Sequence, residues 1–207
     1  LAVIVVYRLA TDAAGTSVAT MLLAGIAIGA IAGSLSSLLE FYASNDMLRR
    51  ISLWRMGGLD GANWPRVAIV AAVAAVILGV LPAQANELNA LLLGESEARH
   101  LGVAVDAVKR RLVLLAAAGV GVSVAVAGAI AFVGLVVPHV VRMLIGPDHR
   151  GLLPASALAG AVLLLAADTL ARLVIAPSEL PVGLLTALLG APFFISLLRR
   201  RREYGMP

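Results

Sequence analysis

The chain has 207 residues, of which 61% are hydrophobic and only 14% are charged, and its mean hydropathy is +0.99. Soluble domains carry about 25% charged residues, so the composition predicts an all-α protein that crosses a membrane several times. The net charge of +4 comes from cations at the ends of apolar runs, which argues against nucleic-acid binding, and the absence of cysteine excludes disulfides, thiolate metal sites and cysteine nucleophiles.

The predicted elements begin in the middle of an apolar run. Residues 1–7 predict the end of a helix that closes at Arg8, and because neither a Met nor a signal peptide precedes them, we expect a fragment of a longer protein. Residues 19–39 predict the first full span, since about 20 apolar residues cross the hydrocarbon. A short surface helix is predicted at 47–56 and the next span at 67–81.

Glycines mark one face of the first full span. Gly25, Gly29 and Gly33 repeat every four residues, so they share a helix face on which small side chains allow close packing. This face is either a subunit interface or pathway wall, or an ordinary packing surface within the chain.

The region 84–111 is polar and predicts one or two amphipathic helices outside the hydrocarbon. Its densest part is a short helix with acidic residues first and basic residues last, as the helix dipole favours. This helix either rests among lipid headgroups or docks into a groove of a partner protein. Its residues are Gly94, Glu95, Ser96, Glu97, Ala98, Arg99, His100, Leu101 and Gly102.

The apolar run 112–137 has two interpretations. It is one tilted helix, or a tight pair of helices that turns near Gly128 and continues to about Ile145. Lys109 precedes the run and Arg142 follows it. If both flanks are cytoplasmic, as their positive charge favours, the chain must cross an even number of times, so we expect the pair.

Two further spans are predicted at 152–175 and 182–198, separated by a turn at 176–181. Asp168 and Arg172 lie four residues apart in the first of these spans, a spacing that lets them neutralise each other. Ionised groups inside a membrane are costly and are usually paired or functional. We expect a structural ion pair, with contact to a transported substrate as the alternative.

This arrangement has six complete spans and a partial one. Eleven of the sixteen cations then lie on one side of the membrane and five on the other, and the positive-inside rule assigns the richer side to the cytoplasm. That side holds Arg8, the region 84–111, the loop 142–151 and the carboxyl terminus.

Several functions lack their sequence signatures. There is no G-x-x-x-x-G-K-[ST] phosphate loop, no H-E-x-x-H and no G-x-S-x-G. We therefore expect no ATP hydrolysis by this chain and no catalytic, cofactor or metal site. An ion-coupled secondary transporter would show inverted repeats, and none stands out. A structural membrane subunit without a pathway is a third alternative.

The motifs as a set resemble the permease subunits of bacterial ABC importers for iron–siderophores, heme and cobalamin. The resemblance covers residues 22–198, and several motifs in a fixed order make it specific. These motifs are 94–102, 132–139 with Arg142, 148–150, 153–154, 166–168 with 171–172, 179–183 and 190–192.

The resemblance implies a ten-helix permease that works as a homodimer in the bacterial inner membrane, with two ATPase subunits inside and a periplasmic binding protein outside. Residues 1–207 would be a single permease domain lacking about the first three to four helices. The region 94–102 would correspond to the segment that couples to the ATPase. The residues predicted to contact the ATPase or assist that contact are Glu95, Glu97, Arg99 and His100, with Asp148, His149 and Arg150.

The resemblance also implies roles for the glycines, the cargo and the outer arginines. The first full span, and the last span with Gly183 and Gly190, would line the pathway near the dimer axis. The amino-acid sequences of several segments are most similar to those of heme importers, so heme is favoured as cargo over a ferric siderophore, with cobalamin third. ATP would be bound by the partner ATPase. Arg49, Arg50 and Arg55 at the outer mouth would attract heme propionates or an anionic siderophore, or pair with acidic residues of the binding protein.

Overall fold

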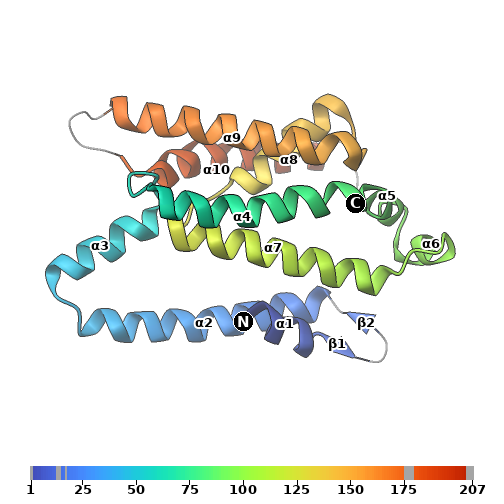
Figure 1. Ribbon diagram of the computed structural model, residues 1–207, viewed down its shortest axis with the longest axis horizontal. Helices are drawn as coiled ribbons and strands as arrows, with labels where there is room; N and C mark the ends of the chain where they lie inside the picture. Colours follow the sequence, from blue (N-terminus) through green and yellow to red (C-terminus); the bar gives the residue numbers. More distant parts are fainter. Residues whose placement is uncertain (1, 13–14, 17, 175–179, 204–207) are drawn as a thin grey trace.

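The computed structural model describes residues 2–12, 15–16, 18–174 and 180–203, which are almost entirely helical (Figure 1). The all-α class is therefore as expected, apart from a small antiparallel hairpin that the sequence did not suggest. The elements are α1 (Ala2–Leu9), β1 (Thr11–Asp12), β2 (Gly15–Thr16), α2 (Val18–Phe41), α3 (Asn45–Met56), α4 (Trp64–Val80), the 3-10 turn η1 (Pro82–Gln84), α5 (Ala85–Leu91), α6 (Glu95–His100), α7 (Val105–Ala127), α8 (Val133–Ile145), α9 (His149–Val174) and α10 (Val182–Glu203).

The long helices run side by side, and the two ends of the bundle hold different segments (Figure 1). One end, called here the α6 end, holds α5, α6, the start of α7 and the turn between α8 and α9. The opposite end, called the α3 end, holds α3, the end of α9 and the start of α10. The segments to which the charge pattern assigns a common side, 84–111 and 142–151, thus lie at one end of the molecule.

In the part of the chain that the structure describes, four helical stretches are long and apolar enough to cross a membrane: α2, α4 with its extension through α5, α7 and α9. Two further apolar helices, α8 and the Val182–Ser196 part of α10, are shorter. At 1.5 Å per residue the 13 residues of α8 extend over about 20 Å, against about 30 Å of hydrocarbon. The count of six complete spans therefore stays a prediction.

Helix boundaries differ from the predicted ones in two instructive places. α7 begins at Val105, so the cations 109–111 lie inside this helix instead of preceding it. α10 continues through the arginines 199–202 to Glu203. In both places the apolar run limits the membrane span but not the helix, because Lys and Arg are good helix formers that continue it into the aqueous phase. Most of the predicted turn at 176–181 lies outside the described residues.

The apolar run 112–137 is divided into two helices, as expected from its flanking charge. Gly128, with φ +71°, follows the end of α7, and Phe132, with φ +66°, precedes α8. The two helices then pack on different neighbours, α7 on α4 and α8 on α9. The predicted break near Gly128 is present, but α7 and α8 are not packed tightly on each other, and the two crossings stay a prediction.

Three glycines allow backbones to meet at the α3 end. A Cβ atom on Gly128 would overlap the carbonyl oxygen of Trp54, and one on Gly183 would overlap that of Met56. A Cβ atom on Gly57 would lie 2.7 Å from a carbonyl oxygen of the link between α7 and α8. We call Gly57, Gly128 and Gly183 the glycine junction, since it joins the end of α3, the α7–α8 link and the start of α10.

Backbone hydrogen bonds close this junction. The N–H of Gly58 donates to the carbonyl of Ala127 at 2.8 Å, and the N–H of Gly183 donates to the carbonyl of Gly57 at 3.1 Å. Irregular backbone at membrane depth is tolerated only where protein buries it and satisfies its polar groups. The junction meets this requirement with direct bonds between three segments.

α9 packs against different neighbours at the two ends of the bundle. Near the α6 end, Leu152 of α9 is buried with Val137 and Val141 of α8. Near the α3 end, Ala167 and Ala171 of α9 are buried with Val182 of α10. One helix therefore contacts two others through separate apolar clusters along its length.

α2 stands apart from this core. It packs against α1, which in turn touches α7 (Figure 1). Large apolar side chains along it are open, including Leu22 at 64% and Ile26 at 70% exposed. Apolar area of this extent is covered either by lipid or by other protein.

Candidate functional site

α6 is set apart from its neighbours by two glycines. Gly94 and Gly102 have φ of +107° and +83°, values that side chains other than glycine rarely adopt, and they turn the chain into and out of the helix. Between them Ala98 is fully buried, and Val105 and Val108 at the start of α7 are 2% exposed. Ala98 is thus the buried residue of this short helix, and the other residues of α6 are exposed.

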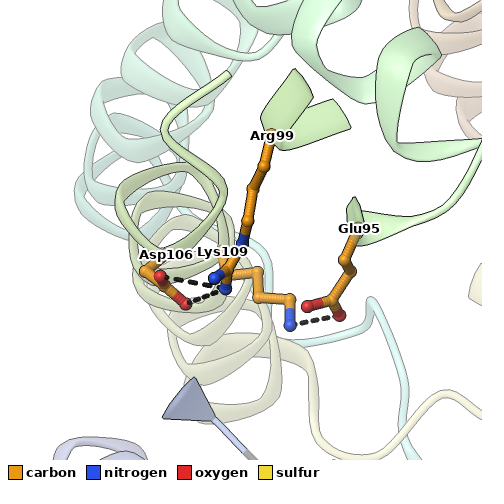
Figure 2. A network of polar contacts seen from close by, with 4 residues as sticks. All are labelled: Glu95, Arg99, Asp106 and Lys109. Atoms are coloured by element: carbon orange, nitrogen blue, oxygen red, sulfur yellow. Dashed lines mark hydrogen bonds and ion pairs between the residues drawn. The ribbon is translucent and has the colours of Figure 1, made fainter. Parts of the chain in front are cut away.

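Two ion pairs, which we call the α6 clamp, tie α6 to α7 (Figure 2). Glu95 pairs with Lys109, and Arg99 reaches Asp106 with 3.2 Å between Nη2 and Oδ2. Apart from Lys109 these side chains are about half exposed, so each pair contributes only about 0.2–1 kcal/mol. Their main effect is to fix the orientation of α6 on α7.

The clamp divides the residues predicted to meet a partner into two groups. Glu95 and Arg99 are engaged with α7, and Ala98 is inaccessible. The exposed surface of α6 is formed by its other members and by apolar side chains next to it. These residues are Ser96, Glu97 and His100, with Leu101 at 64%, Leu93 at 65% and Leu92 at 50% exposed.

A second polar cluster joins α5 to the start of α9. The Asn89 side chain donates from Nδ2 to Oδ1 of Asp148 at 2.7 Å, and its Oδ1 accepts the backbone N–H of His149 at 2.9 Å. Arg150 donates from Nε to Oδ1 of Asn86 at 2.9 Å. The predicted assisting residues 148–150 therefore face α5, the helix that leads directly into α6.

The Asp148 carboxylate is held in its charged form. The backbone N–H of Arg150 donates to it at 3.0 Å, and this bond, followed by the one from Asn89, lowers the pKa of Asp148 below its ordinary value. Its carboxylate and its carbonyl, which accepts the N–H of Leu152 at 2.9 Å, together cap α9. Neither Asn86 nor Asn89 is among the residues predicted from the sequence, although two amides three residues apart on one helix face are a usable signal.

The α3 end holds charged pairs of its own. Asp168 and Arg172 pair with 2.9 Å between Oδ2 and Nε, as the spacing suggested, and they line a small cavity of about 180 Å³ together with Asp60 and the region of the glycine junction. Arg55 pairs with Glu40 at 2.5 Å and so joins α3 to the end of α2.

Some of the other predicted residues are exposed, and others pack against residues of the same chain. Arg49 and Arg50 are exposed, and a Cβ atom added at Gly25, Gly29 or Gly33 would have nothing within 4 Å of it. Gly183 belongs to the glycine junction, and Gly190 lies against the ring of Phe132, so these two pack within the chain. Within the described residues no three His, Asp or Glu side chains gather as a metal site would require.

Comparison with known proteins places this architecture. The sequence matches the FecCD transport family over residues 1–200. The chain belongs to this family. It is accordingly a multi-pass helical protein of the inner membrane, with the four span-length helices described above.

Two relatives of this FecCD-family chain differ in the cargo their names give. It is 52% identical over 189 residues to the hemin transport system permease protein HmuU of Yersinia pestis, covering 90% of this chain and 56% of the relative. It is 47% identical over 201 residues to the cobalamin import system permease protein BtuC of Halobacterium salinarum, covering 97% and 54%. The chain thus spans about half the length of the curated relatives it matches.

A solved structure shares the fold of the FecCD-family chain. This ABC transporter, assigned to the metal-chelate type and described in an inward-facing conformation, superposes with a TM-score of 0.87 at 32% sequence identity. The match covers 96% of this chain and 63% of that one. The arrangement of α1 to α10 is therefore that of an ABC transporter chain.

Proposed function

We propose that the chain is part of the permease subunit of an ATP-driven importer that carries heme inward across the bacterial inner membrane. The observation that carries this proposal is the 52% identity to a hemin permease over 90% of the chain. The geometry of the α6 end supports it, because an exposed helix outside the apolar spans is tied by two ion pairs to α7.

In this proposal α6 is the contact to an ATPase subunit. Its exposed face, with Glu97, His100 and Leu101, offers charge and apolar surface to a partner. The α6 clamp passes displacement of this helix to α7. An ATPase pair that closes on ATP and opens after hydrolysis would thus switch the membrane helices between two packings, as alternating access requires.

The α3 end then faces the periplasm and receives cargo from a binding protein. Arg49 and Arg50 are exposed there and are suited to acidic groups of the binding protein or to the carboxylates of heme. The open glycine face of α2 is suited to close packing with a second permease copy along the pathway.

Cobalamin is the second candidate cargo. It is favoured by the 47% identity to a cobalamin permease over 97% of the chain. A ferric siderophore is the third candidate, from the resemblance to the wider family. These cargoes differ in charge and shape, and the described residues include no group of ligands dedicated to iron.

The proposal is tested by reconstituting the full-length permease with its ATPase and binding protein in liposomes. We expect heme uptake that requires ATP and that excess cobalamin or ferric siderophore does not compete away. Uptake that follows a proton or sodium gradient without nucleotide would refute the importer. Preferred uptake of cobalamin would keep the importer and replace the cargo.

A further inference from the structure

The Asn89 side chain is built into the cap of another helix. The first N–H groups of any α-helix lack partners within that helix, and at the start of α9 one of them, that of His149, donates to the Asn89 Oδ1 at 2.9 Å. The same oxygen lies 2.8 Å from the His149 Nδ1, and the amide nitrogen donates to Asp148 at 2.7 Å. The oxygen and the nitrogen of one side-chain amide thus form hydrogen bonds with two successive residues, which lie 59 and 60 positions later in the sequence.

This link differs from the neighbouring one between Asn86 and Arg150. The contact with Arg150 is a single exposed bond at the end of a flexible side chain. The bond from Asn89 to the His149 backbone is partly buried, and Asn89 has a short side chain with few rotamers. Asn89 therefore holds the helix start itself, whereas Asn86 holds a mobile side chain.

The Asn89 link joins α5, which continues into α6, to α9, which continues to the α3 end. On one side the backbone passes from α5 to α6 through a tight turn, with the N–H of Leu92 donating to the carbonyl of Asn89 at 3.2 Å and that of Gly94 to Leu91 at 3.1 Å. On the other side α9 runs for 26 residues, or about 39 Å, and holds the Asp168–Arg172 ion pair in its last two turns, at the α3 end.

We propose that Asn89 is a positioning residue that makes α5, α6 and α9 move as one rigid unit, so that displacement of α6 reaches the α3 end along α9. The inference rests on the proposed function, since it names the route by which an ATPase contact acts on the membrane helices. Displacement of α6 then reaches the membrane helices by two routes, through the α6 clamp to α7 and through α5 and the Asn89 link to α9.

A charge-neutral exchange of side chains provides a sharp test. Asn89→Ala removes the contacts of this side chain with Asp148 and with the His149 N–H and Nδ1, and Asn89→Asp places two carboxylates against each other. The double substitution Asn89→Asp with Asp148→Asn reverses the donor and the acceptor: the new amide at position 148 donates to the new carboxylate at position 89, which still accepts the N–H of His149. Asn86→Ala is the matched control, since it removes only the bond from Arg150.

The readout is the distance between spin labels on α6 and α9 in the full transporter with its ATPase, with and without trapped ATP. Ser96 and Leu158 are exposed, so Ser96→Cys and Leu158→Cys carry the labels in a transporter freed of its other cysteines, and cargo uptake is measured on the same variants without labels. We expect an unchanged distance on ATP binding in the parent, the Asn86→Ala control and the double exchange. We expect a shifted or broadened distance in Asn89→Ala and Asn89→Asp, with cargo uptake per ATP hydrolysed lower by about fivefold or more.

Three results would overturn the inference. The parent distance changes on ATP binding, Asn89→Ala behaves as the parent does, or the double exchange inserts normally but behaves as Asn89→Asp does. Failure of the proposed function is seen separately, as a parent complex without ATP-driven uptake. In that case the label distance still decides whether α6 and α9 form one body.

Discussion

Gly128→Ala should destabilise the protein more than any ordinary surface substitution. The left-handed φ of +71° costs alanine about 1–2 kcal/mol. The new methyl group also overlaps the backbone carbonyl of Trp54, which cannot rotate away as a side chain would, and overpacking of this kind adds about 1–3 kcal/mol. Reduced freedom of the unfolded chain offsets about 0.4–1 kcal/mol. The free energy of unfolding should therefore fall by about 1–4.6 kcal/mol.

The matched control lies in α7, the helix that ends just before Gly128. Gly121 has nothing within 4 Å of an added Cβ and an ordinary helical φ, so Gly121→Ala should raise stability by about 0.5–1 kcal/mol. Both variants of the full-length permease would be unfolded by titrating SDS into mixed micelles, with helicity followed by circular dichroism. A Gly128→Ala variant within about 0.5 kcal/mol of the parent would refute the close approach of α3 to the α7–α8 link.

Three further predictions concern the exposed helices. Reversing either charge of the Glu95–Lys109 pair should speed hydrogen exchange in α6, and exchanging both charges should restore the parent rate, with a coupling of about 0.2–1 kcal/mol. Glu97→Ala combined with His100→Ala should lower co-purification of the ATPase while membrane insertion stays normal, because both side chains are exposed on α6. Gly29→Leu should lower the dimer fraction without lowering the free energy of unfolding, because nothing in the chain lies within 4 Å of that position.

Each of these predictions has its own contrary result. An additive effect of the two charge reversals would mean that the ion pair does not form. For the ATPase contact, the control is Asp46→Ala with Arg49→Ala, which removes one acid and one base from exposed positions on α3 at the opposite end. Equal loss of co-purification in both double variants would argue against a specific role for α6. A Gly29→Leu protein that dimerises and transports normally would make the glycine face of α2 a lipid contact.

The sequence predicted the elements whose signal is local. Spans appeared as apolar runs, and the division of the long run near Gly128 followed from cations on both of its flanks, a constraint that needs no tertiary information. The spacing of Asp168 and Arg172 is likewise a property of one helix, and the pair is present in the structure. The short helix 94–102 could be located by its bracketing glycines.

Features that depend on distant segments could not be predicted. Gly183 was assigned to pathway or dimer packing, but nothing local to it indicates that the end of α3, more than 120 residues earlier, supplies the carbonyl against which it packs. The same holds for Asn89, whose partners follow a different span. The family resemblance marked Glu95 and Arg99 as partner contacts, whereas their pairing with α7 depends on how the turn at Gly102 folds α6 back.

The central claim is that the α6 end lies in the cytoplasm, where an ATPase subunit can reach it. The most direct measurement is maleimide labelling of Ser96→Cys in the full-length protein freed of other cysteines, with Asp46→Cys on α3 as the marker of the opposite side. In intact cells with a permeable outer membrane, an impermeant reagent should modify position 46 and reach position 96 only after the inner membrane is opened. Modification of position 96 from outside intact cells would contradict the account.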